Sequence, residues 1–218
     1  MSAQNTEAAD IAVIDYGMGN IRSVTNALTF VGANFRVISG PDQIGVADGL
    51  LLPGVGALRD CIKALRESGL DAAVADWIAA DKPFLGVCLG MQALFEYSEE
   101  AGIEGLGIFP GNVVKFKVPE GLKVPHMGWN AVDFQKDDPV MNRGIESGKD
   151  QFYFVHSYHV ETPREDIVWA RADYGYSFVS AISTGRVFAT QFHPEKSQSK
   201  GLQLYRNFVE LSGSAVSV

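Results

Sequence analysis

The sequence has few cysteines, a deficit of basic residues and no long apolar run. Only two cysteines, Cys61 and Cys88, occur in 218 residues, which argues against a disulfide scaffold and favours a reducing compartment. The formal net charge of −8 argues against a nucleic-acid partner. No segment approaches the roughly 18 apolar residues of a membrane span, and the first residues, MSAQNTEAAD, do not resemble a signal peptide. We therefore expect a cytoplasmic protein that binds neither nucleic acid nor a membrane.

The order of strand-like and helix-like segments predicts an α/β fold. In the first part of the chain, short apolar runs alternate with segments of helical periodicity. These runs are 11–16, 35–39, 49–54 and 83–87. Such alternation predicts a mainly parallel sheet flanked by helices, and the short β-type segments after about residue 105 predict antiparallel edge strands. We expect a single domain over 11–211, with flexible tails at 1–10 and 212–218.

Helical structure is predicted in three stretches of the chain. Ser68 and Gly69 should interrupt the helical stretch that starts near Leu58. The segment 91–100, MQALFEYSEE, is expected to continue as a helix from the strand before it. An apolar stripe in 200–211 predicts a helix near the end of the chain.

Cys88 stands in the sequence GVCLG, with a glycine two residues away on each side. A strand that turns directly into a helix needs small neighbours, and this pattern is typical of a nucleophile elbow, here with a cysteine in place of serine. The elbow exposes the side chain at the sheet edge and directs the free N–H groups of the helix towards it. Cys88 is therefore a candidate nucleophile, whereas Cys61 lies on an apolar helical stripe typical of a buried structural cysteine.

His193 is the candidate base, because it follows an apolar strand in the sequence His193-Pro194-Glu195. Proline fixes the backbone, so the Glu195 carboxylate can turn back to bind one imidazole nitrogen while the other nitrogen faces the thiol. None of the remaining histidines, His126, His156 and His159, has an acid two positions away on a rigid turn. Taken alone, His-Pro-Glu is also compatible with an ordinary turn.

The sequence LLLPGVG (50–56) is a candidate oxyanion loop, since it ends a strand with two glycines around Val55. Backbone N–H groups of Gly54 and Val55, together with the N–H of Leu89, could stabilise a developing oxyanion. Many strand-to-helix connections are equally rich in glycine, so the loop by itself does not establish this role.

The motifs PGVG, GVCLGMQ and HPE, in this order, resemble those of the class I (triad) glutamine amidotransferases over almost the whole chain. DYGMGNIRSV, the GMQ after the elbow, and PHMGWN followed by FYFVHSYHV are most similar to the branch that provides glutaminase subunits in histidine biosynthesis. The resemblance implies the corresponding α/β fold and no cofactor or metal.

The resemblance also implies roles for individual residues. Cys88 would attack the side-chain amide of glutamine to give a thioester and ammonia, with His193 as the base and Glu195 orienting it. The implied substrate-binding residues are Gln92, Glu100, Ser157 and Tyr158. Judged by residue type alone, Glu100 could also be a solvated surface charge.

A protein partner is implied as well, namely a cyclase subunit with a (β/α)8 barrel fold that receives the ammonia. The residues that match positions near this interface are Asn20, Met127, Trp129 and Lys196. Met127 and Trp129 are, by residue type, as compatible with the core as with an interface.

Two alternatives remain open at this point. Another class I amidotransferase, or a free-standing γ-glutamyl hydrolase, would use the same triad, and the hydrolase would need no partner. A non-enzymatic binding module of flavodoxin type would use DYGMGN as a phosphate loop, but Arg22 stands where the third glycine of the dinucleotide fingerprint belongs.

Overall fold

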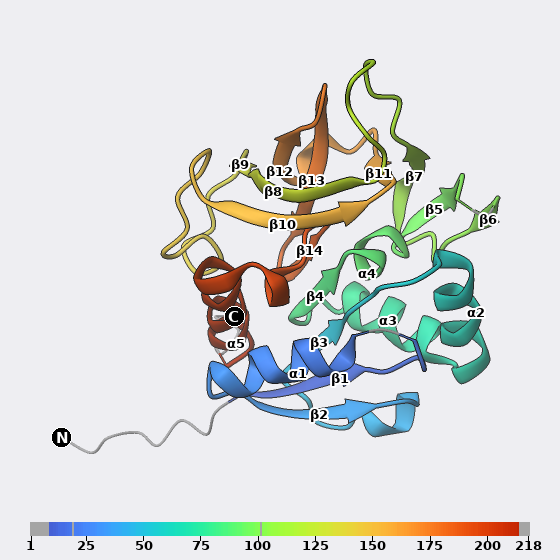
Figure 1. Cartoon of the computed structure of the whole chain (residues 1–218). Coiled ribbons are helices and arrows are strands. Elements are labelled where there is room, and N and C mark those ends of the chain that lie inside the picture. The colour runs from blue at the N-terminus through green and yellow to red at the C-terminus, as the bar shows by residue number, and fades with distance from the viewer. Residues whose placement is uncertain (1–8, 19, 101, 214–218) are drawn as a thin grey trace.

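The computed structural model describes residues 9–18, 20–100 and 102–213 (Figure 1). Its main sheet has 12 strands, and one half of it is parallel, in the order β2-β1-β3-β4-β14. These strands are β1 (Asp10–Ile14), β2 (Asn34–Ile38), β3 (Gly49–Leu52), β4 (Phe84–Val87) and β14 (Val187–Thr190). The predicted mainly parallel sheet with antiparallel edge strands is confirmed.

Helices cover both faces of this parallel half. They are α1 (Ile21–Phe30), α2 (Leu58–Ser68), α3 (Leu70–Ala79), the short α4 (Leu89–Gln92) and α5 (Gln198–Gly213). Side chains alternate along β1: Ile11 and Val13 pack in a core with α1 and α5, whereas Ala12 and Ile14 pack in a core with α2 and α3. None of the described helices is long and apolar enough to cross a membrane.

The other half of the main sheet is largely antiparallel and continues from β14 through β13, β11 and β7 to β5 and β6. Its strands are β5 (Phe95–Ser98), β6 (Ile103–Glu104), β7 (Phe109–Lys115), β9 (Asp133–Phe134), β11 (Tyr158–Glu161), β12 (Val168–Asp173) and β13 (Ser177–Thr184). A separate antiparallel pair, β8 (His126–Ala131) and β10 (Gln151–His156), lies above α5 in Figure 1. Short 3-10 turns occur at η1 (Pro41–Gln43), η2 (Glu165–Ile167) and η3 (Pro194–Lys196).

The helix predicted over 91–100 is wrong, because α4 ends at Gln92 and β5 follows from Phe95 to Ser98. The N–H groups of Gly105 and Gly107 donate to the carbonyls of Glu96 and Phe95, respectively. In a helix these two carbonyls would instead accept hydrogen bonds from N–H groups of the helix itself. A side chain at Gly105 would overlap the Phe95 carbonyl. Only a glycine therefore allows this later segment to come close enough to replace the helix.

The break between α2 and α3 and the two ends of the domain were also predicted. The break at Ser68 and Gly69 is confirmed, since α2 ends there and Gly69 is left-handed at φ 75°. Of the predicted tails, residues 1–8 and 214–218 lie outside the described residues. Asp10 already belongs to β1, and α5 continues through Ser212 and Gly213.

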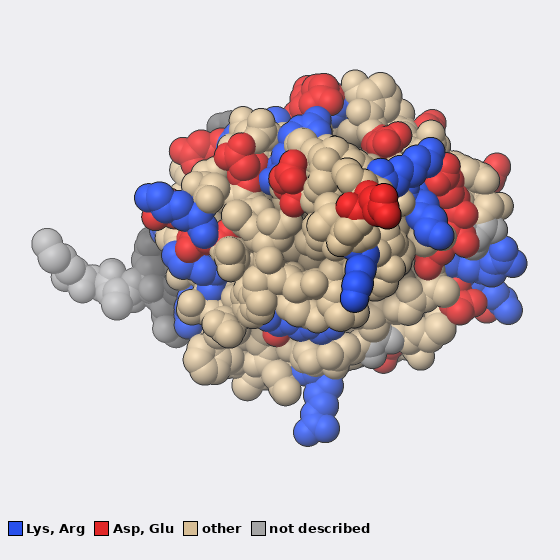
Figure 2. All heavy atoms as spheres, turned by 45° about the horizontal axis from the view of Figure 1, so that its top comes forward, with Lys and Arg blue, Asp and Glu red and all other residues tan. Residues whose placement is uncertain are grey.

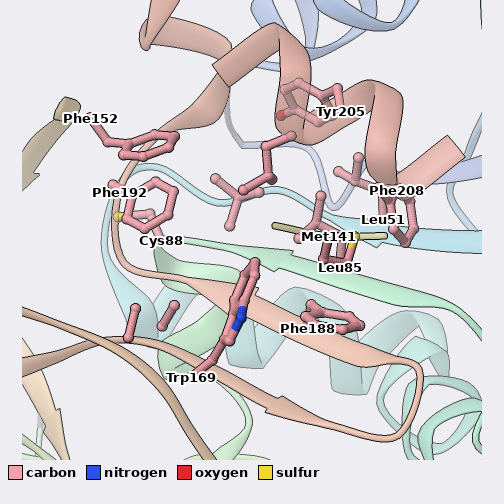
Figure 3. Packing of buried hydrophobic residues seen from close by; sticks show 14 of the residues in the cluster. Leu51, Leu85, Cys88, Met141, Phe152, Trp169, Phe188, Phe192, Tyr205 and Phe208 are labelled. Carbon is pink, nitrogen blue, oxygen red and sulfur yellow. The ribbon is translucent and has the colours of Figure 1, made fainter. Parts of the chain in front are cut away.

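The core that includes α1 and α5 brings the nucleophile candidate next to aromatic side chains (Figure 3). Phe152 and Phe192 have ring centroids 4.3 Å apart, and Cys88 lies at the edge of the cluster beside Phe192. Trp169 and Phe188 pack further along the same core at 5.0 Å. Cys88 thus packs against a close-packed apolar cluster, which holds the elbow in place.

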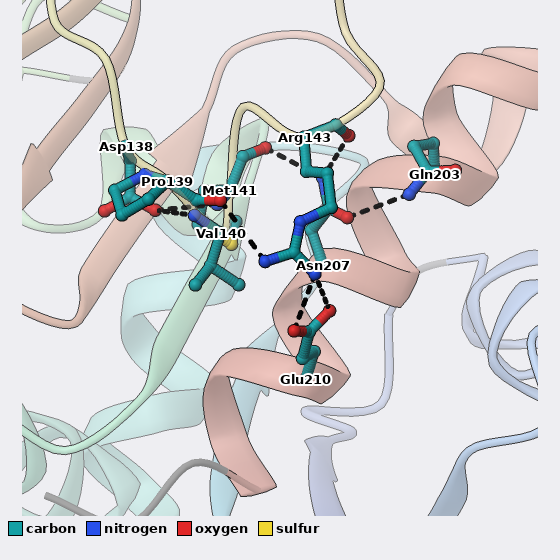
Figure 4. A network of polar contacts seen from close by, with 8 residues as sticks. All are labelled: Asp138, Pro139, Val140, Met141, Arg143, Gln203, Asn207 and Glu210. Carbon is teal, nitrogen blue, oxygen red and sulfur yellow. Dashed lines mark hydrogen bonds and ion pairs between the residues drawn. The ribbon is translucent and has the colours of Figure 1, made fainter.

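An irregular segment before β10 is fastened to α5 by polar contacts (Figure 4). The Asn207 amide donates to the carbonyls of Met141 and Arg143, at 3.0 and 2.8 Å. Arg143 also pairs with Glu210 on the same helix at 2.6 Å. These contacts anchor the chain that leads into β10.

Candidate active site

Cys88 occupies a sharp turn between β4 and α4 in a backbone conformation that is rare for a residue with a side chain. Its φ is 53° and its ψ is −103°, and such geometry is typically retained where the surrounding structure enforces it. The Cys88 side chain is 5% exposed, and both cysteines are free. The sharp strand-to-helix turn of the predicted elbow is therefore present, but the Cys88 side chain is buried and lines a cavity instead of being exposed at the sheet edge.

Three glycines allow the elbow to form by permitting close backbone contacts. A Cβ atom at Gly86 would lie 2.7 Å from the Gly90 carbonyl oxygen, and one at Gly90 would overlap the Leu52 carbonyl. A Cβ atom at Gly54 would lie 2.5 Å from the Cβ of Leu89. The loop after β3 consequently lies directly against the start of α4.

The backbone N–H group of Leu89 is available next to the cysteine. Because α4 begins at Leu89, the N–H of this residue has no acceptor within the helix. Val55, Leu89 and Cys88 line the same cavity. Gly54 packs under the elbow instead, so that among the predicted oxyanion residues Val55 and Leu89 are the two that reach the cavity.

His193 reaches Cys88 because β14 pairs in parallel with β4. The Cys88 N–H donates to the Thr190 carbonyl at 2.7 Å, and the chain then leads from β14 into His193. His193 Nδ1 donates to Glu195 Oε1 at 2.8 Å. The other ring nitrogen, Nε2, is buried and has no hydrogen-bond partner among the described residues.

The environment favours a protonated imidazole at His193. Burial is the largest single influence and lowers its pKa, but interactions with Cys88 and then with Glu195 outweigh it and raise the pKa of His193 to about 10. The His193 and Glu195 side chains are only 1% and 2% exposed, so water screens their attraction little. This arrangement suits an imidazolium that is held between the Cys88 sulfur and the Glu195 carboxylate.

The cavity above Cys88 has a volume of about 380 Å³. It brings together predicted residues from distant parts of the sequence: Val55, Cys88, Leu89, Gln92, Glu100, Ser157, Tyr158, His193 and Lys196. Glu195 lies behind His193 and does not line the cavity. A cavity of this size accommodates a small molecule such as an amino acid.

Gln92 and Tyr158 are joined at the wall of this cavity. The Gln92 Nε2 donates to the Tyr158 carbonyl at 3.1 Å and to Gln191 Oε1 at 3.0 Å. The Gln191 Nε2 in turn donates to the Cys88 sulfur at 3.5 Å. Sequence analysis missed Gln191; the available signal was a polar residue at a strand end two positions before His193.

Glu100 is not simply a solvated charge. Its Oε2 accepts a 3.2 Å hydrogen bond from the N–H of Leu58, the first residue of α2. Ala57, the residue that precedes this helix, offers no side-chain cap, so the Glu100 carboxylate takes that place and is favoured by the helix dipole. From there it also borders the cavity.

The residues predicted at the partner interface lie in three different places. Met127 and Trp129 lie on β8 and are 60% and 44% exposed, so they are surface rather than core residues. Lys196 is at the cavity, with its Nζ 6.0 Å from the centroid of the Tyr153 ring. Asn20, in contrast, caps α1 by accepting from the Ser23 N–H at 3.2 Å.

Figure 2 shows the face on the side of β8 and β10, with the top of the molecule in Figure 1 turned forward. Charged side chains gather towards its upper part and its sides, and a broad, mostly uncharged area with a few basic side chains in it occupies the middle. Exposed apolar side chains in a setting of this kind are typical of protein interfaces.

Comparison with known proteins agrees with this geometry. The family described as Glutamine amidotransferase class-I matches residues 12–211. The chain is 50% identical over 203 residues to the imidazole glycerol phosphate synthase subunit HisH of Acinetobacter baylyi, covering 92% of this chain and 97% of that one. It is also 50% identical over 209 residues to the HisH subunit of Nitrosococcus oceani, covering 94% and 99%.

Among solved structures, PurLQS from Thermotoga maritima superimposes with a TM-score of 0.74 at 18% identity, covering 93% of this chain and 98% of that one. This likeness concerns the fold alone. The family match over nearly the whole chain, together with the two relatives, identifies the chain as a member of the class-I glutamine amidotransferase family.

Proposed function

We infer that the chain is the glutaminase subunit of imidazole glycerol phosphate synthase, which hydrolyses glutamine to glutamate and ammonia and passes the ammonia to a cyclase subunit. The observation that carries this inference is the 50% identity over almost the full length of two relatives of that name. The arrangement of Cys88, His193 and Glu195 around one cavity supports it.

The proposed reaction begins with the Cys88 thiolate, whose sulfur attacks the side-chain amide carbon of glutamine. Negative charge then develops on the amide oxygen, and the N–H groups of Leu89 and Val55 are the candidate donors to it, each typically worth about 3 kcal/mol of barrier. His193 gives its Nε2 proton to the departing nitrogen, so that ammonia leaves and a γ-glutamyl thioester remains.

Hydrolysis of the thioester completes the cycle. The now neutral His193 removes a proton from water, the resulting hydroxide attacks the thioester carbon, and the sulfur leaves as thiolate with release of glutamate. Glu195 holds His193 Nδ1 throughout, which keeps Nε2 directed at the reacting atoms. The substrate's α-ammonium would pair with Glu100, and its α-carboxylate would contact the backbone and side chains of Ser157 and Tyr158.

The proposal includes a partner, since ammonia set free in water would be lost to the synthase reaction. We assign this role to a cyclase subunit with a (β/α)8 barrel fold, docked on the face that carries Met127, Trp129 and Lys196. The exposure of the first two side chains supports this placement. The two free cysteines support a cytoplasmic location.

The test is ammonia release from glutamine, measured first with the chain alone and then with the cyclase subunit and its nucleotide ligand. A low rate that rises by orders of magnitude in the complex is expected. A high rate that is indifferent to the cyclase would contradict the partner assignment and would favour a free-standing γ-glutamyl hydrolase with the same triad.

A further inference from the structure

Two buried histidines form a direct imidazole pair beside the cavity. His126 on β8 and His156 on β10 face each other across the strand pair, and His126 Nδ1 lies 3.0 Å from His156 Nε2. The rings pack among aromatic side chains, with His126 stacked on Tyr174 at 4.1 Å and on Phe154 at 4.8 Å. Neither histidine has a place in the reaction described above.

The partners of this pair fix the position of every proton in it. His156 Nδ1 lies 2.8 Å from the Tyr158 carbonyl, which only accepts, so Nδ1 carries the proton and His156 Nε2 is an acceptor. His126 must then donate from its own Nδ1, and its Nε2 accepts from the Asn130 amide at 3.3 Å. The same amide nitrogen donates to the Asp173 carbonyl at 2.7 Å.

Both rings need to be neutral for this pattern, and their surroundings ensure it. Burial lowers the pKa of His126 to about 4 and, as the largest influence, lowers the pKa of His156 to about 3. At neutral pH the donors therefore point in one direction, from Asn130 through His126 and His156 to the carbonyl of Tyr158.

The chain of hydrogen bonds continues to the nucleophile. The Tyr158 carbonyl also accepts from Gln92, Gln92 donates to Gln191, and Gln191 donates to the Cys88 sulfur. Gln92 and Tyr158 both line the cavity. At its other end the chain starts on β8, the strand that exposes Met127 and Trp129.

We infer that His126 is a positioning residue for the glutamine site: acting through His156, it fixes the Tyr158 carbonyl and with it the Gln92 amide, and it ties both groups to strand β8. This inference rests on the proposed glutaminase function. Loss of the His126 donor leaves His156 Nε2 buried without a partner, so that His156 is free to turn and to release Tyr158.

The test compares two substitutions that separate hydrogen bonding from packing. His126→Phe keeps a ring among the aromatic neighbours but removes the donor. His126→Asn places an amide nitrogen where Nδ1 was and keeps the donor, but it leaves space where the ring had been. His159→Phe is the matched control, because His159 belongs to the same aromatic cluster but bonds Val160 and Tyr176 instead of Tyr158.

Each variant is assembled with the cyclase subunit, and KM and kcat for glutamine are measured together with the thermal midpoint. We expect His126→Phe to raise KM about five- to tenfold, as for one lost hydrogen bond, with kcat changed by less than about threefold. His126→Asn should return KM to within about twofold of the unaltered chain although it is the less stable variant, and His159→Phe should leave KM unchanged.

An unchanged KM in His126→Phe would overturn the inference, and so would a KM that simply follows the loss of stability and is worse in His126→Asn. If the unaltered complex does not hydrolyse glutamine, the proposed function itself fails, which is visible before any variant is made. Nitrogen-15 NMR of labelled histidines in the unaltered complex is independent of activity: His126 and His156 should both carry a single proton on Nδ1, and a proton on Nε2 of either ring would contradict the pairing.

Discussion

His193 and Glu195 are joined by a 2.8 Å hydrogen bond although only Pro194 separates them in the chain. The short turn Pro194–Lys196 makes this possible, because it directs the carboxylate back towards Nδ1. Both side chains are almost completely buried. The proposed base and its orienting acid are thus held by one rigid turn, and the proposed nucleophile approaches from a different strand.

The two cysteines should respond very differently to substitution. Cys88→Ser is expected to reduce glutamine-dependent ammonia release by about a thousandfold or more, while the fold and the use of free ammonia by the complex persist. Cys61→Ala removes a fully buried sulfur on α2, so it should cost about 1–3 kcal/mol of stability and leave activity intact. Ammonia release and urea unfolding measure both effects. An inactive but folded Cys61→Ala variant would contradict the assignment of Cys88 as the nucleophile.

Stability should decline at alkaline pH because of His193. Its pKa in the folded chain is about 10, above the roughly 6.5 of an unfolded histidine. The stabilisation from the protonated ring is therefore complete below about pH 6.5 and is lost as pH rises through about 10, by an amount on the order of a few kcal/mol. Urea unfolding at pH 7 and pH 10 should show this decline in the unaltered chain and a much smaller one in Cys88→Ala. Equal declines would argue against a charged pair.

Stability should also decline at acidic pH because of the buried imidazole pair. The pKa values of His126 and His156 are lowered to about 4 and about 3, so the unfolded chain takes up protons first as pH falls below about 6.5. The free energy of unfolding should therefore decrease between about pH 6.5 and pH 4. His126→Phe removes one of the two groups and should show a shallower decrease, by on the order of 2 kcal/mol. Identical pH profiles would contradict this assignment.

Gly54 should not tolerate a side chain. A Cβ atom there would lie 2.5 Å from the Cβ of Leu89, so Gly54→Ala is expected to push the loop away from the elbow, to cost about 1–3 kcal/mol and to lower kcat at least tenfold. Gly213→Ala is the control, because its Cβ atom would meet Ala9 at an ordinary 3.5 Å. Thermal midpoints and glutaminase rates of the two variants test the difference, and a fully active Gly54→Ala enzyme would argue against the close packing of loop and elbow.

Trp129 is expected to contribute to cyclase binding and little to folding. It is 44% exposed, and aromatic side chains at interfaces often account for a large share of affinity. Trp129→Ala should weaken binding to the cyclase roughly 10- to 100-fold without a large change in thermal midpoint. Tyr97→Ala on β5 removes an aromatic ring of similar exposure, 42%. Comparable losses of binding in both variants, measured by calorimetry, would speak against the proposed docking face.

Sequence reasoning was effective where the signal is local. The strands of the parallel half, the break at Gly69 and the elbow at Cys88 each depend on a few adjacent residues with a marked physical preference. The His-Pro-Glu turn is of the same kind, because its geometry is set within three residues.

Other features arise from contacts between distant segments and therefore leave little trace in a local pattern. The segment after α4 becomes a strand because Gly105 and Gly107 approach its carbonyls. Gln191 appears in the sequence as one polar residue in an apolar strand, and only the pairing of β14 with β4 brings it to the Cys88 sulfur. The pairing of His126 with His156 depends in the same way on the register of β8 against β10.

The position of β14 beside β4 has a consequence for the protein during its synthesis. The strand that leads into His193 is the last of the described strands, yet it pairs next to the strand that leads into Cys88. A nascent or truncated chain that ends before β14 would hold the cysteine without its base, in a sheet that still lacks a central strand. During synthesis the thiol should therefore stay catalytically silent until the segment that contains β14, His193 and Glu195 has been made and has paired beside β4.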